Sequence, residues 1–260
     1  MISVEEALSI IKNEVNPLKT EIIHITRAAN RVLAEEVIAA VDNPPLDVSA
    51  MDGYALRYPQ KNEVEGGYEL LGTSAAGSPF EGTLKPYSAV RIYTGAAIPN
   101  GTDYVEIQEN VNCKDNHIFI RLKSSNHHIR TKGSDFSEGD RILNCSERLN
   151  IRHIGLLAAA NKPWVRVYRQ PRVAIISTGD EIALPGDSIS KHQITSSNGL
   201  ALEAFVRVCG GIPYNLGTVR DDREALIRIA EESKEFDVII STGGVSVGDR
   251  DLVAESFVKA

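Results

Sequence analysis

The chain has 260 residues, of which 42% are hydrophobic and 24% are charged, a composition typical of a globular protein with room for two or three modest domains. Its formal net charge of −7 argues against a nucleic-acid partner and against binding to an anionic membrane, because both need a basic surface. No apolar run approaches membrane-spanning length, and three widely spaced cysteines predict neither a disulfide framework nor a zinc site.

The start of the chain predicts two helices. Residues 1–6 lack the basic segment of a signal peptide, so we expect a cytoplasmic protein. Ser3 and Glu6 form a capping box ahead of an amphipathic apolar pattern, which predicts the first helix. Thr26 begins the second candidate helix, which would extend to about Leu33.

A loop that contains prolines and acids follows at residues 44–57. Its two adjacent prolines fix the entry and Gly53 allows a positive φ angle, so we expect an ordered loop. Asp47 and Asp52 would then project from a rigid backbone, which is how proteins hold a divalent cation or a proton-transfer group. The alternative for this segment is an ordinary surface turn between strands.

The region from Val41 to about Asp140 predicts a small β domain, because its short apolar runs are separated by Gly, Pro and Asn and show little helical periodicity. The candidate strands are 69–71, 89–93 and 117–120. Helical periodicity returns at 151–160 and ends before a proline. Because helical segments flank the β region on both sides, we expect the β domain to be inserted into the first domain.

From Pro171 onward the sequence alternates between strand, loop and helix. Residues 173–176 and 238–240 are uninterrupted apolar runs, as strands covered on both faces require. One helix is predicted from about Ser197 to Val208 and another after Asp222, with a weaker strand between them at about 214–216. This alternation predicts a parallel sheet flanked by helices.

Acidic residues follow all three predicted strands of this sheet. Ligands of open α/β sheets collect where the strands end, so Glu181, Asp221 and Asp251 should meet at one edge. The glycine-rich backbone there can approach a phosphate closely. The alternatives are local: Asp221 or Asp251 would cap a helix, and Thr94, Asp135 or Asp52 would complete a turn.

Short motifs recur in order along nearly the whole chain. They are Ser-Ala-Met-Asp-Gly-Tyr-Ala at 49–55, Ile-Tyr-Thr-Gly-Ala at 92–96, Pro-Asn-Gly-Thr-Asp at 99–103, Lys-Gly-Ser-Asp at 132–135, Ser-Thr-Gly-Asp-Glu at 177–181, Ser-Asn-Gly at 197–199, Arg-Asp-Asp at 220–222 and Ser-Thr-Gly-Gly-Val-Ser-Val-Gly at 241–248. Together they resemble the MoeA family, the molybdopterin molybdenumtransferases of molybdenum-cofactor biosynthesis, to which the E domain of gephyrin belongs. The order of the motifs makes coincidence very improbable.

The chain departs from the family in one respect, because it stops at Ala260, where family members continue. A Pro-Gly-Lys-Pro loop, a Gly-Leu-Pro-Gly-Asn-Pro loop and a terminal small β domain have no counterpart here. The first of these loops would add positive charge to the acidic cleft. We therefore expect a fragment that binds substrate weakly and turns it over poorly.

The resemblance implies an α/β multidomain fold. An elongated α+β N-terminal domain with an inserted small β domain would precede a three-layer α/β domain with a mostly parallel sheet, similar to the MogA and MoaB proteins and incomplete at its C-terminus. The implied domains are a discontinuous linker or dimerisation domain at 1–42 and 143–170, the inserted β domain at 43–142, and a truncated molybdopterin-binding domain at 171–260.

The implied activity is a magnesium-dependent transfer of molybdenum from molybdate to adenylylated molybdopterin, with hydrolytic release of AMP. The catalytic residues carried over are Asp52, Thr94, Asp135, Glu181, Asp221 and Asp251, of which Glu181, Asp221 and Asp251 are the metal ligands. The cofactor-binding residues are Ser177, Thr178, Gly179, Asp180, Ser197, Asn198, Gly243, Gly244, Ser246 and Gly248. Carboxylates would repel these anionic substrates, and a bridging Mg²⁺ resolves this repulsion.

The resemblance also implies a homodimer whose active site lies between subunits, and a contact with the molybdopterin adenylyltransferase. Two other readings stay open. One is a non-catalytic module that binds molybdopterin or acts as a scaffold, and the other is an unrelated nucleotide-binding α/β protein.

Overall fold

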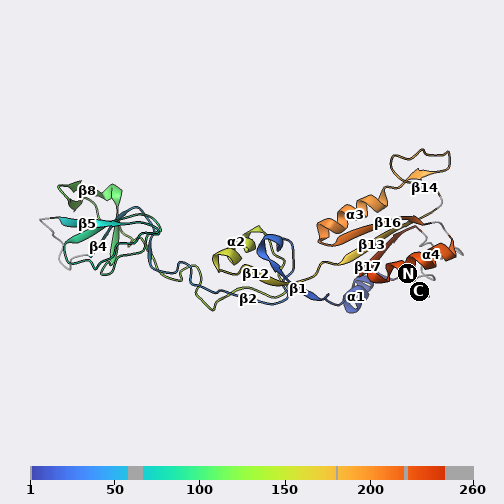
Figure 1. The fold of residues 1–260 in the computed structure, drawn as a ribbon, viewed down its shortest axis with the longest axis horizontal. Helices are drawn as coiled ribbons and strands as arrows, with labels where there is room; N and C mark the ends of the chain where they lie inside the picture. The colour runs from blue at the N-terminus through green and yellow to red at the C-terminus, as the bar shows by residue number, and fades with distance from the viewer. Residues whose placement is uncertain (1, 58–66, 180, 220–221, 244–260) are drawn as a thin grey trace. The chain divides into compact units, whose positions relative to one another are not determined.

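The computed structural model describes residues 2–57, 67–179, 181–219 and 222–243, and the structural statements below concern these ranges. The chain forms two compact units, each with its own sheet (Figure 1). Unit 1 consists of Met1–Ile23, Ala28–Ala34 and Arg166–Ala260, and unit 2 of His24–Arg27 and Glu35–Val165. Among the helices in the described ranges, none combines the length and the apolar character needed to cross a membrane.

Unit 1 is built around a parallel sheet of three strands in the order β16-β13-β17. Its elements are β13 (Arg172–Thr178), α3 (Asn198–Cys209), β16 (Ile212–Val219), α4 (Arg223–Glu232), η3 (Ser233–Glu235) and β17 (Val238–Thr242). Figure 1 shows α3 on one side of this sheet and α4 on the other. The predicted parallel sheet with flanking helices is confirmed, and the strand expected to be weak is eight residues long.

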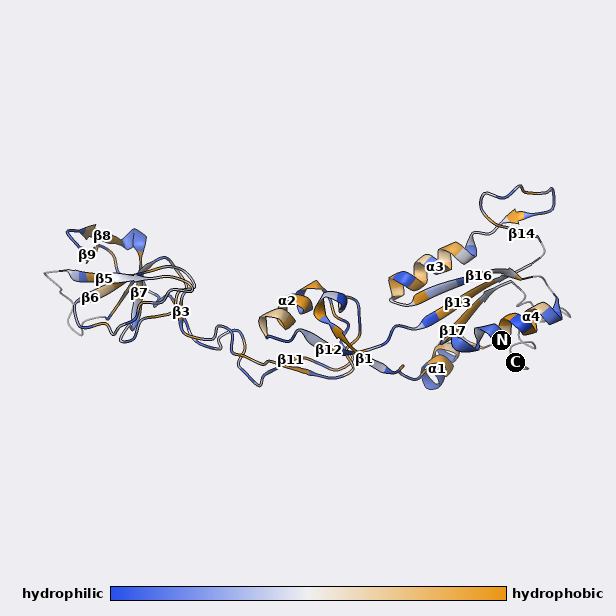
Figure 2. Cartoon of the chain, in the orientation of Figure 1, coloured by the Kyte–Doolittle hydropathy of each residue, from blue (hydrophilic) through white to orange (hydrophobic). Residues whose placement is uncertain are grey.

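Strand β13 lies in the centre of the sheet because its apolar residues favour burial. Residues 173–176 are all buried, and Figure 2 shows the apolar colour along the strand. Val173 and Ile175 pack against Val206 of α3. Burial of side chains of this size contributes roughly 1.5–3 kcal/mol each.

An ion pair joins the starts of β13 and β17. Two guanidinium nitrogens of Arg169 donate to the Asp237 carboxylate, at 2.6 and 2.5 Å, and the Arg172 N–H donates to Asp237 Oδ2 at 2.8 Å. The hydrogen bonds from Arg169 are the main reason that the pKa of Asp237 falls to about 2. This end of the sheet is therefore fixed electrostatically.

The first predicted helix is confirmed as α1 (Val4–Glu14). Ser3 Oγ accepts the Glu6 N–H at 3.1 Å, which is the capping contact that the sequence predicts. None of the residues of α1 is buried. The other elements here are the pair β1 (Thr20–His24) and β12 (Trp164–Tyr168), and the pair β14 (Ile182–Ala183) and β15 (Ile194–Thr195).

The second predicted helix is wrong. Only a single 3-10 turn, η1 (Ile25–Arg27), forms there. Asn30 then adopts a φ of 65°, which a right-handed helix cannot contain, and Leu33 is fully buried in an antiparallel bridge with Val167. The burial of Leu33 in extended backbone outweighs the local helical preference.

Unit 2 contains a six-stranded sheet in the order β7-β4-β6-β5-β9-β8. Its elements are β4 (Gly53–Leu56), β5 (Tyr68–Ser74), β6 (Ser88–Ile92), β7 (Tyr104–Ile107), η2 (Gln108–Asn110), β8 (Val111–Lys114) and β9 (His117–Ile120). The three predicted strands of the β region are confirmed as β5, β6 and β9. Most neighbouring strands are antiparallel, but β5 and β6 are parallel.

Both faces of this sheet carry apolar clusters, because successive side chains of a strand point to opposite faces. Leu56 of β4 packs with Ala89 and Tyr104 on one face, whereas Ala55 packs with Ile92 and Val105 on the other. The face that carries Leu56 also carries polar side chains toward the start of β4. These side chains belong to the site described below.

The rest of unit 2 contains two small antiparallel sheets and a helix. The elements are β2 (Val37–Ile38) with β11 (Arg141–Leu143), β3 (Val48–Ser49) with β10 (Ile129–Arg130), and α2 (Ile151–Ala159). Asn150 caps α2 through a capping box with His153, so the helix predicted at 151–160 is confirmed. The predicted domain boundaries are finer than the division into two units and stay a prediction.

Candidate functional site

The best-defined acidic residue is Asp52, at the start of β4. The antiparallel register of β4 and β6 places Gly53 opposite Ile92, which brings Asp52 beside Thr94. The Thr94 N–H and the Thr94 hydroxyl both donate to Asp52 Oδ1, each at 2.8 Å. In the part of the chain that the structure describes, no hydrogen bond reaches the other oxygen, Oδ2. Asp52 therefore has one oxygen held by the fold and one available to a ligand.

The environment keeps Asp52 ionised. The Thr94 N–H contributes most to lowering the pKa of the carboxyl group, and the Thr94 hydroxyl comes next. Partial desolvation opposes the shift, while the positive charge of Arg91 adds to it. A carboxylate in this state can bind a cation or accept a proton from a stronger acid.

Acidic side chains form the hydrogen bonds of the predicted loop before β4. The positive φ angle expected at Gly53 is wrong, because Gly53 begins strand β4 and has extended backbone. Asp47 Oδ1 accepts the Lys132 N–H at 2.8 Å. Asp42 Oδ1 accepts the Glu138 N–H at 2.9 Å, and the Lys132 ammonium lies 3.0 Å from Asp42 Oδ2. The bond from Glu138 is the largest cause of the lowered pKa of Asp42. These two aspartates support the loop through contacts with one neighbouring segment.

Asp135 belongs to a different cluster. Arg130 Nη2 donates to both of its carboxylate oxygens, at 2.9 and 2.8 Å, and Asn43 Nδ2 donates to Oδ2 at 3.3 Å. Asn43 precedes the acidic loop, whereas Asp52 ends it. Within the described residues no hydrogen bond joins the two clusters, so the structure pairs Asp52 with Thr94 but does not add Asp135 to them.

In unit 1 the predicted residues gather where β13 and β17 end. The Thr242 hydroxyl bonds to Ser177 Oγ at 3.2 Å, and the Thr178 hydroxyl donates to the Thr242 carbonyl at 3.4 Å. Gly243 approaches Thr178 so closely that a Cβ at position 243 would lie 2.4 Å from the Thr178 carbonyl oxygen. Only glycine fits this approach.

The start of α3 reaches the same edge of the sheet. A Cβ at position 199 would lie 3.2 Å from Ser177 Oγ, which places Ser197 and Asn198 beside the end of β13. Backbone N–H groups at a helix start favour anions. The described members of the predicted cofactor-binding set, Ser177, Thr178, Gly179, Ser197, Asn198 and Gly243, are therefore brought to one edge.

Glu181 lies at this edge with an exposed side chain. Its carboxylate rests against Gly179, since an ideal Cβ there would meet Oε2 at 2.7 Å. The Glu181 carbonyl accepts the Ile194 N–H at 2.9 Å, whereas its carboxylate makes no hydrogen bond or ion pair to any residue of the described ranges. The other predicted site residues in unit 1, Asp180, Asp221, Gly244, Ser246, Gly248 and Asp251, lie outside the described residues.

One of the local alternatives concerns the start of α4. The N-cap of α4 is Asp222, whose carboxylate accepts the Ala225 N–H at 3.0 Å, and Asp221, the capping residue considered above, lies outside the described residues. A metal-ligand set is not visible: among the described residues no group of three or more His, Cys, Asp and Glu side chains is arranged to hold a metal ion.

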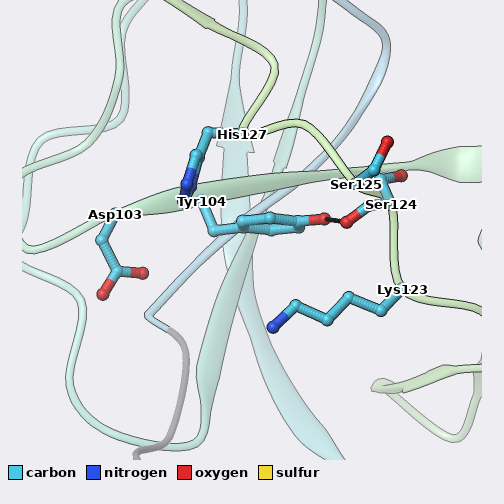
Figure 3. Close-up of a pocket in the computed structure, with 6 residues that line it drawn as sticks. All are labelled: Asp103, Tyr104, Lys123, Ser124, Ser125 and His127. Carbon is cyan, nitrogen blue, oxygen red and sulfur yellow. Dashed lines mark hydrogen bonds between the residues drawn. The ribbon is translucent and has the colours of Figure 1, made fainter.

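A separate hollow of about 270 Å³ lies beside β7 (Figure 3). Its lining residues are Asp103, Tyr104, Lys123, Ser124, Ser125 and His127. The Tyr104 ring lies between His127 and Lys123, and its hydroxyl donates to the Ser124 carbonyl at 2.5 Å. None of the predicted site residues lines this hollow, so it is distinct from the Asp52–Thr94 pair.

The sequence analysis missed two polar residues that contact the Asp52 site, Arg91 and Gln108. Arg91 is a charged residue inside an otherwise apolar strand pattern, which is the one signal that pointed to it. Gln108 carries no local signal, because its place depends on the pairing of β4 with β7.

Comparisons with known proteins agree along the whole chain. Residues 2–161 match the family profile described as the MoeA N-terminal region (domain I and II), and residues 174–260 match the profile of a probable molybdopterin binding domain. A molybdopterin molybdenumtransferase from Nostoc is 39% identical over 97% of this chain and 60% of its own length. The protein of that name from Haemophilus influenzae is 36% identical over 91% of this chain and 59% of its own length.

A solved structure from Pyrococcus, described as a molybdopterin biosynthesis MoeA protein, superposes with a TM-score of 0.83 at 30% identity. It matches all of this chain and 66% of the solved chain. The chain thus spans about 60% of the length of the curated relatives that it matches. Because a family profile covers more than half of it, the chain belongs to the MoeA family.

Proposed function

We propose that this chain acts in molybdenum-cofactor biosynthesis, as part of a molybdopterin molybdenumtransferase. The reaction would transfer molybdenum from molybdate to adenylylated molybdopterin. Water would cleave the pyrophosphate bond, so that AMP leaves with one phosphate while the pterin keeps the other. The observation that carries this proposal is the alignment with relatives of that name along 97% of the chain.

The geometry of both units supports this chemistry. At the edge of the parallel sheet, hydroxyl groups of Ser177 and Thr178 and the start of α3 suit the phosphates of a nucleotide-linked pterin. In unit 2 the Asp52–Thr94 pair offers a fixed carboxylate. We propose that Asp52, Thr94 and Asp135 complete the site, with Asp135 contributing from its own cluster.

The acidic residues fit a hard divalent cation. Glu181 has an exposed carboxylate without a hydrogen bond in the described ranges, and Mg²⁺ prefers oxygen ligands of this kind. We propose Glu181 as a magnesium ligand together with Asp221 and Asp251. Bound Mg²⁺ would neutralise the charge between these carboxylates and the anionic substrates.

The proposed assembly is a cytoplasmic homodimer. Its site would combine Asp52, Thr94 and Asp135 of one subunit with Glu181, Asp221 and Asp251 of the other, and it would receive its substrate by contact with the adenylyltransferase. We also propose the finer architecture expected from the resemblance, with an inserted β domain and an α/β domain similar to MogA and MoaB.

The reaction is tested by supplying the purified protein with adenylylated molybdopterin, Mg²⁺ and molybdate. AMP is then measured by chromatography and pterin-bound molybdenum by mass spectrometry. We expect both products at the low rate predicted from the sequence, and we expect both to disappear when Mg²⁺ is removed. Saturable binding of the pterin without AMP release would instead support a non-catalytic binding module.

A substitution tests the role of Asp52. Asp52→Asn keeps the shape of the side chain and removes its charge, so we expect AMP release to fall about 100-fold or more. The matched control is Asp115→Asn, at an exposed aspartate in the turn between β8 and β9. Wild-type rates from Asp52→Asn at normal abundance would reject the assignment.

A further inference from the structure

The side chain of Arg91, on strand β6, reaches across strand β4 to Gln108, which follows strand β7. It lies on β6 directly opposite Tyr54 of β4, and its Nη2 group donates to Oε1 of Gln108, immediately after β7. The order β7-β4-β6 places β4 between these two partners. The Arg91–Gln108 bond therefore passes over β4 at its start.

Two aromatic rings hold the guanidinium group in this place. Its central carbon lies 4.9 Å from the centroid of the Tyr54 ring and 5.1 Å from that of Tyr93. Cation–π contacts at such distances fix the orientation of an arginine as well as its position. Arg91 is half-buried, so these contacts are only partly screened by water.

The backbone that carries Asp52 is bonded by the backbone amide of Gln108 and by the side chain of Arg91. The Gln108 N–H donates to the Asp52 carbonyl at 3.1 Å, and Arg91 Nη1 donates to the Gly53 carbonyl at 3.4 Å. Gly53 itself packs so tightly on β7 that a Cβ there would lie 2.0 Å from the Glu106 carbonyl oxygen. The Asp52–Gly53 backbone is thus held from both neighbouring strands.

We propose that Arg91, acting through Gln108 and the Gly53 carbonyl, is a positioning residue that fixes the Asp52 carboxylate against Thr94 for the reaction. The inference rests on the proposed function in one respect, since the importance of Asp52 for turnover is itself proposed. Arg91 touches no reacting atom in this account. It determines where Asp52 lies and contributes positive charge beside it.

The electrostatics of the site agree with this role. The two hydrogen bonds from Thr94 do most to lower the pKa of Asp52, and the charge of Arg91 acts in the same direction. Removal of Arg91 should weaken both influences, because a carboxylate that moves away from Thr94 loses hydrogen bonds together with the nearby charge.

The test begins with a measurement that needs no activity. In ¹⁵N-resolved NMR spectra, the Thr94 amide shift follows the ionisation of Asp52, because that amide donates to the carboxylate. We expect Arg91→Met to move the midpoint of the Thr94 titration to higher pH. Arg121→Met is the matched control, since Arg121 is exposed and its side chain makes no hydrogen bond or ion pair within the described residues. An unchanged midpoint in folded Arg91→Met would overturn the inference.

Kinetics then separate positioning from substrate binding. We expect Arg91→Met to lower kcat about 10- to 100-fold while KM changes less than about twofold, because the misplaced group acts on turnover. Arg91→Lys keeps the charge but loses the fork that reaches both Gln108 and Gly53. It should retain most of the Asp52 ionisation and still show reduced kcat. A wild-type kcat in Arg91→Lys would overturn the positioning role. This test remains possible even if Arg91→Met does not fold.

The two arms distinguish the inference from the proposed function. A shifted Thr94 titration in a protein without transferase activity would support the role of Arg91 in holding Asp52 and reject the assigned reaction. If instead the wild-type protein is an active transferase and Arg91→Met leaves the Thr94 titration unchanged, the assigned reaction is supported and the role of Arg91 is rejected.

Discussion

In unit 2 the Asp52 carboxylate is held by the fold itself, whereas in unit 1 the Glu181 carboxylate is exposed and meets no hydrogen-bond donor among the described residues. Thr94 fixes one oxygen of Asp52, and neighbouring strands fix its backbone. Glu181 follows the end of β13, and its carboxylate lies beside Gly179. Acidic side chains thus occur here both with hydrogen-bond donors fixed by the fold and without donors among the described residues.

The fixed part of unit 1 lies at the opposite end of its sheet. Asp237 and Arg169 join the starts of β13 and β17, whereas Glu181 follows the end of β13. A parallel sheet can be rigid at one end while its ligand-binding end keeps groups available. The Asp52 carboxylate is thus positioned by hydrogen bonds of the protein itself, whereas the Glu181 carboxylate has none among the described residues.

Gly53→Ala should have the largest effect on the free energy of unfolding. The added Cβ would lie 2.0 Å from the backbone oxygen of Glu106, which cannot rotate away, so strand β4 must move. We expect a loss of about 3 kcal/mol in the free energy of unfolding, measured by urea denaturation followed by circular dichroism.

Gly155→Ala is the matched control for Gly53→Ala. Gly155 lies within α2, and a Cβ there meets nothing within 4 Å. This change should stabilise the protein by about 0.5–1 kcal/mol, because alanine is the better helix former. A Gly53→Ala protein with unchanged stability would show that the backbone around Asp52 is not rigid.

A smaller effect is expected from Asp237→Asn. Because folding lowers the pKa of Asp237 from 3.8 to about 2, its charge contributes stability that is present above about pH 4 and is lost as the pH falls toward 2. We expect a loss of about 2 kcal/mol at pH 7 and almost none near pH 2, measured from unfolding curves at both pH values.

Glu235→Gln serves as the control for that measurement. Glu235 lies 3.8 Å from Arg172 and its side chain is 81% exposed, so its ion pair should contribute less than about 0.5 kcal/mol. Equal losses from Asp237→Asn at neutral and at acid pH would contradict the ionic origin of the stabilisation.

The smallest effect on the free energy of unfolding is expected for Glu181, in unit 1. Glu181→Gln should change the free energy of unfolding by no more than about 0.5 kcal/mol, since the carboxylate has no hydrogen bond to lose in the described ranges. Thermal melting in the absence of substrate measures this. A loss above about 1 kcal/mol would mean that the fold itself orders Glu181.

Local patterns were sufficient for the α-helices, for the strands of the parallel sheet and for the group of residues at its edge. The Ser3 cap predicted α1, and the apolar run at 173–176 predicted a buried parallel strand. The gathering of Ser177 with Gly243 could be predicted as well, because the ends of parallel strands meet at one edge whatever the side-chain details.

The Asp52–Thr94 pair was identified by resemblance to a family, and its geometry was not predictable from local patterns. Asp52 and Thr94 are 42 positions apart, and the register of β4 with β6 brings them together. Asp135 was assigned to the same group but bonds to Arg130 and Asn43 instead. A residue type in a motif does not specify its hydrogen-bond partner.

The sequence was therefore sufficient for the α/β class, the family, the α-helices of the described ranges, the strands of the parallel sheet, three strands of the six-stranded sheet, and the residues at the edge of the parallel sheet. The long-range contacts of the folded chain were needed to see that the segment after Thr26 forms no α-helix, that Asp222 caps α4, and that Arg91 and Gln108 bond to the backbone at Asp52 and Gly53. The physical reason is the range of the interactions. Caps and apolar periodicity act between near neighbours in the chain, whereas strand register and burial depend on residues that meet only after folding.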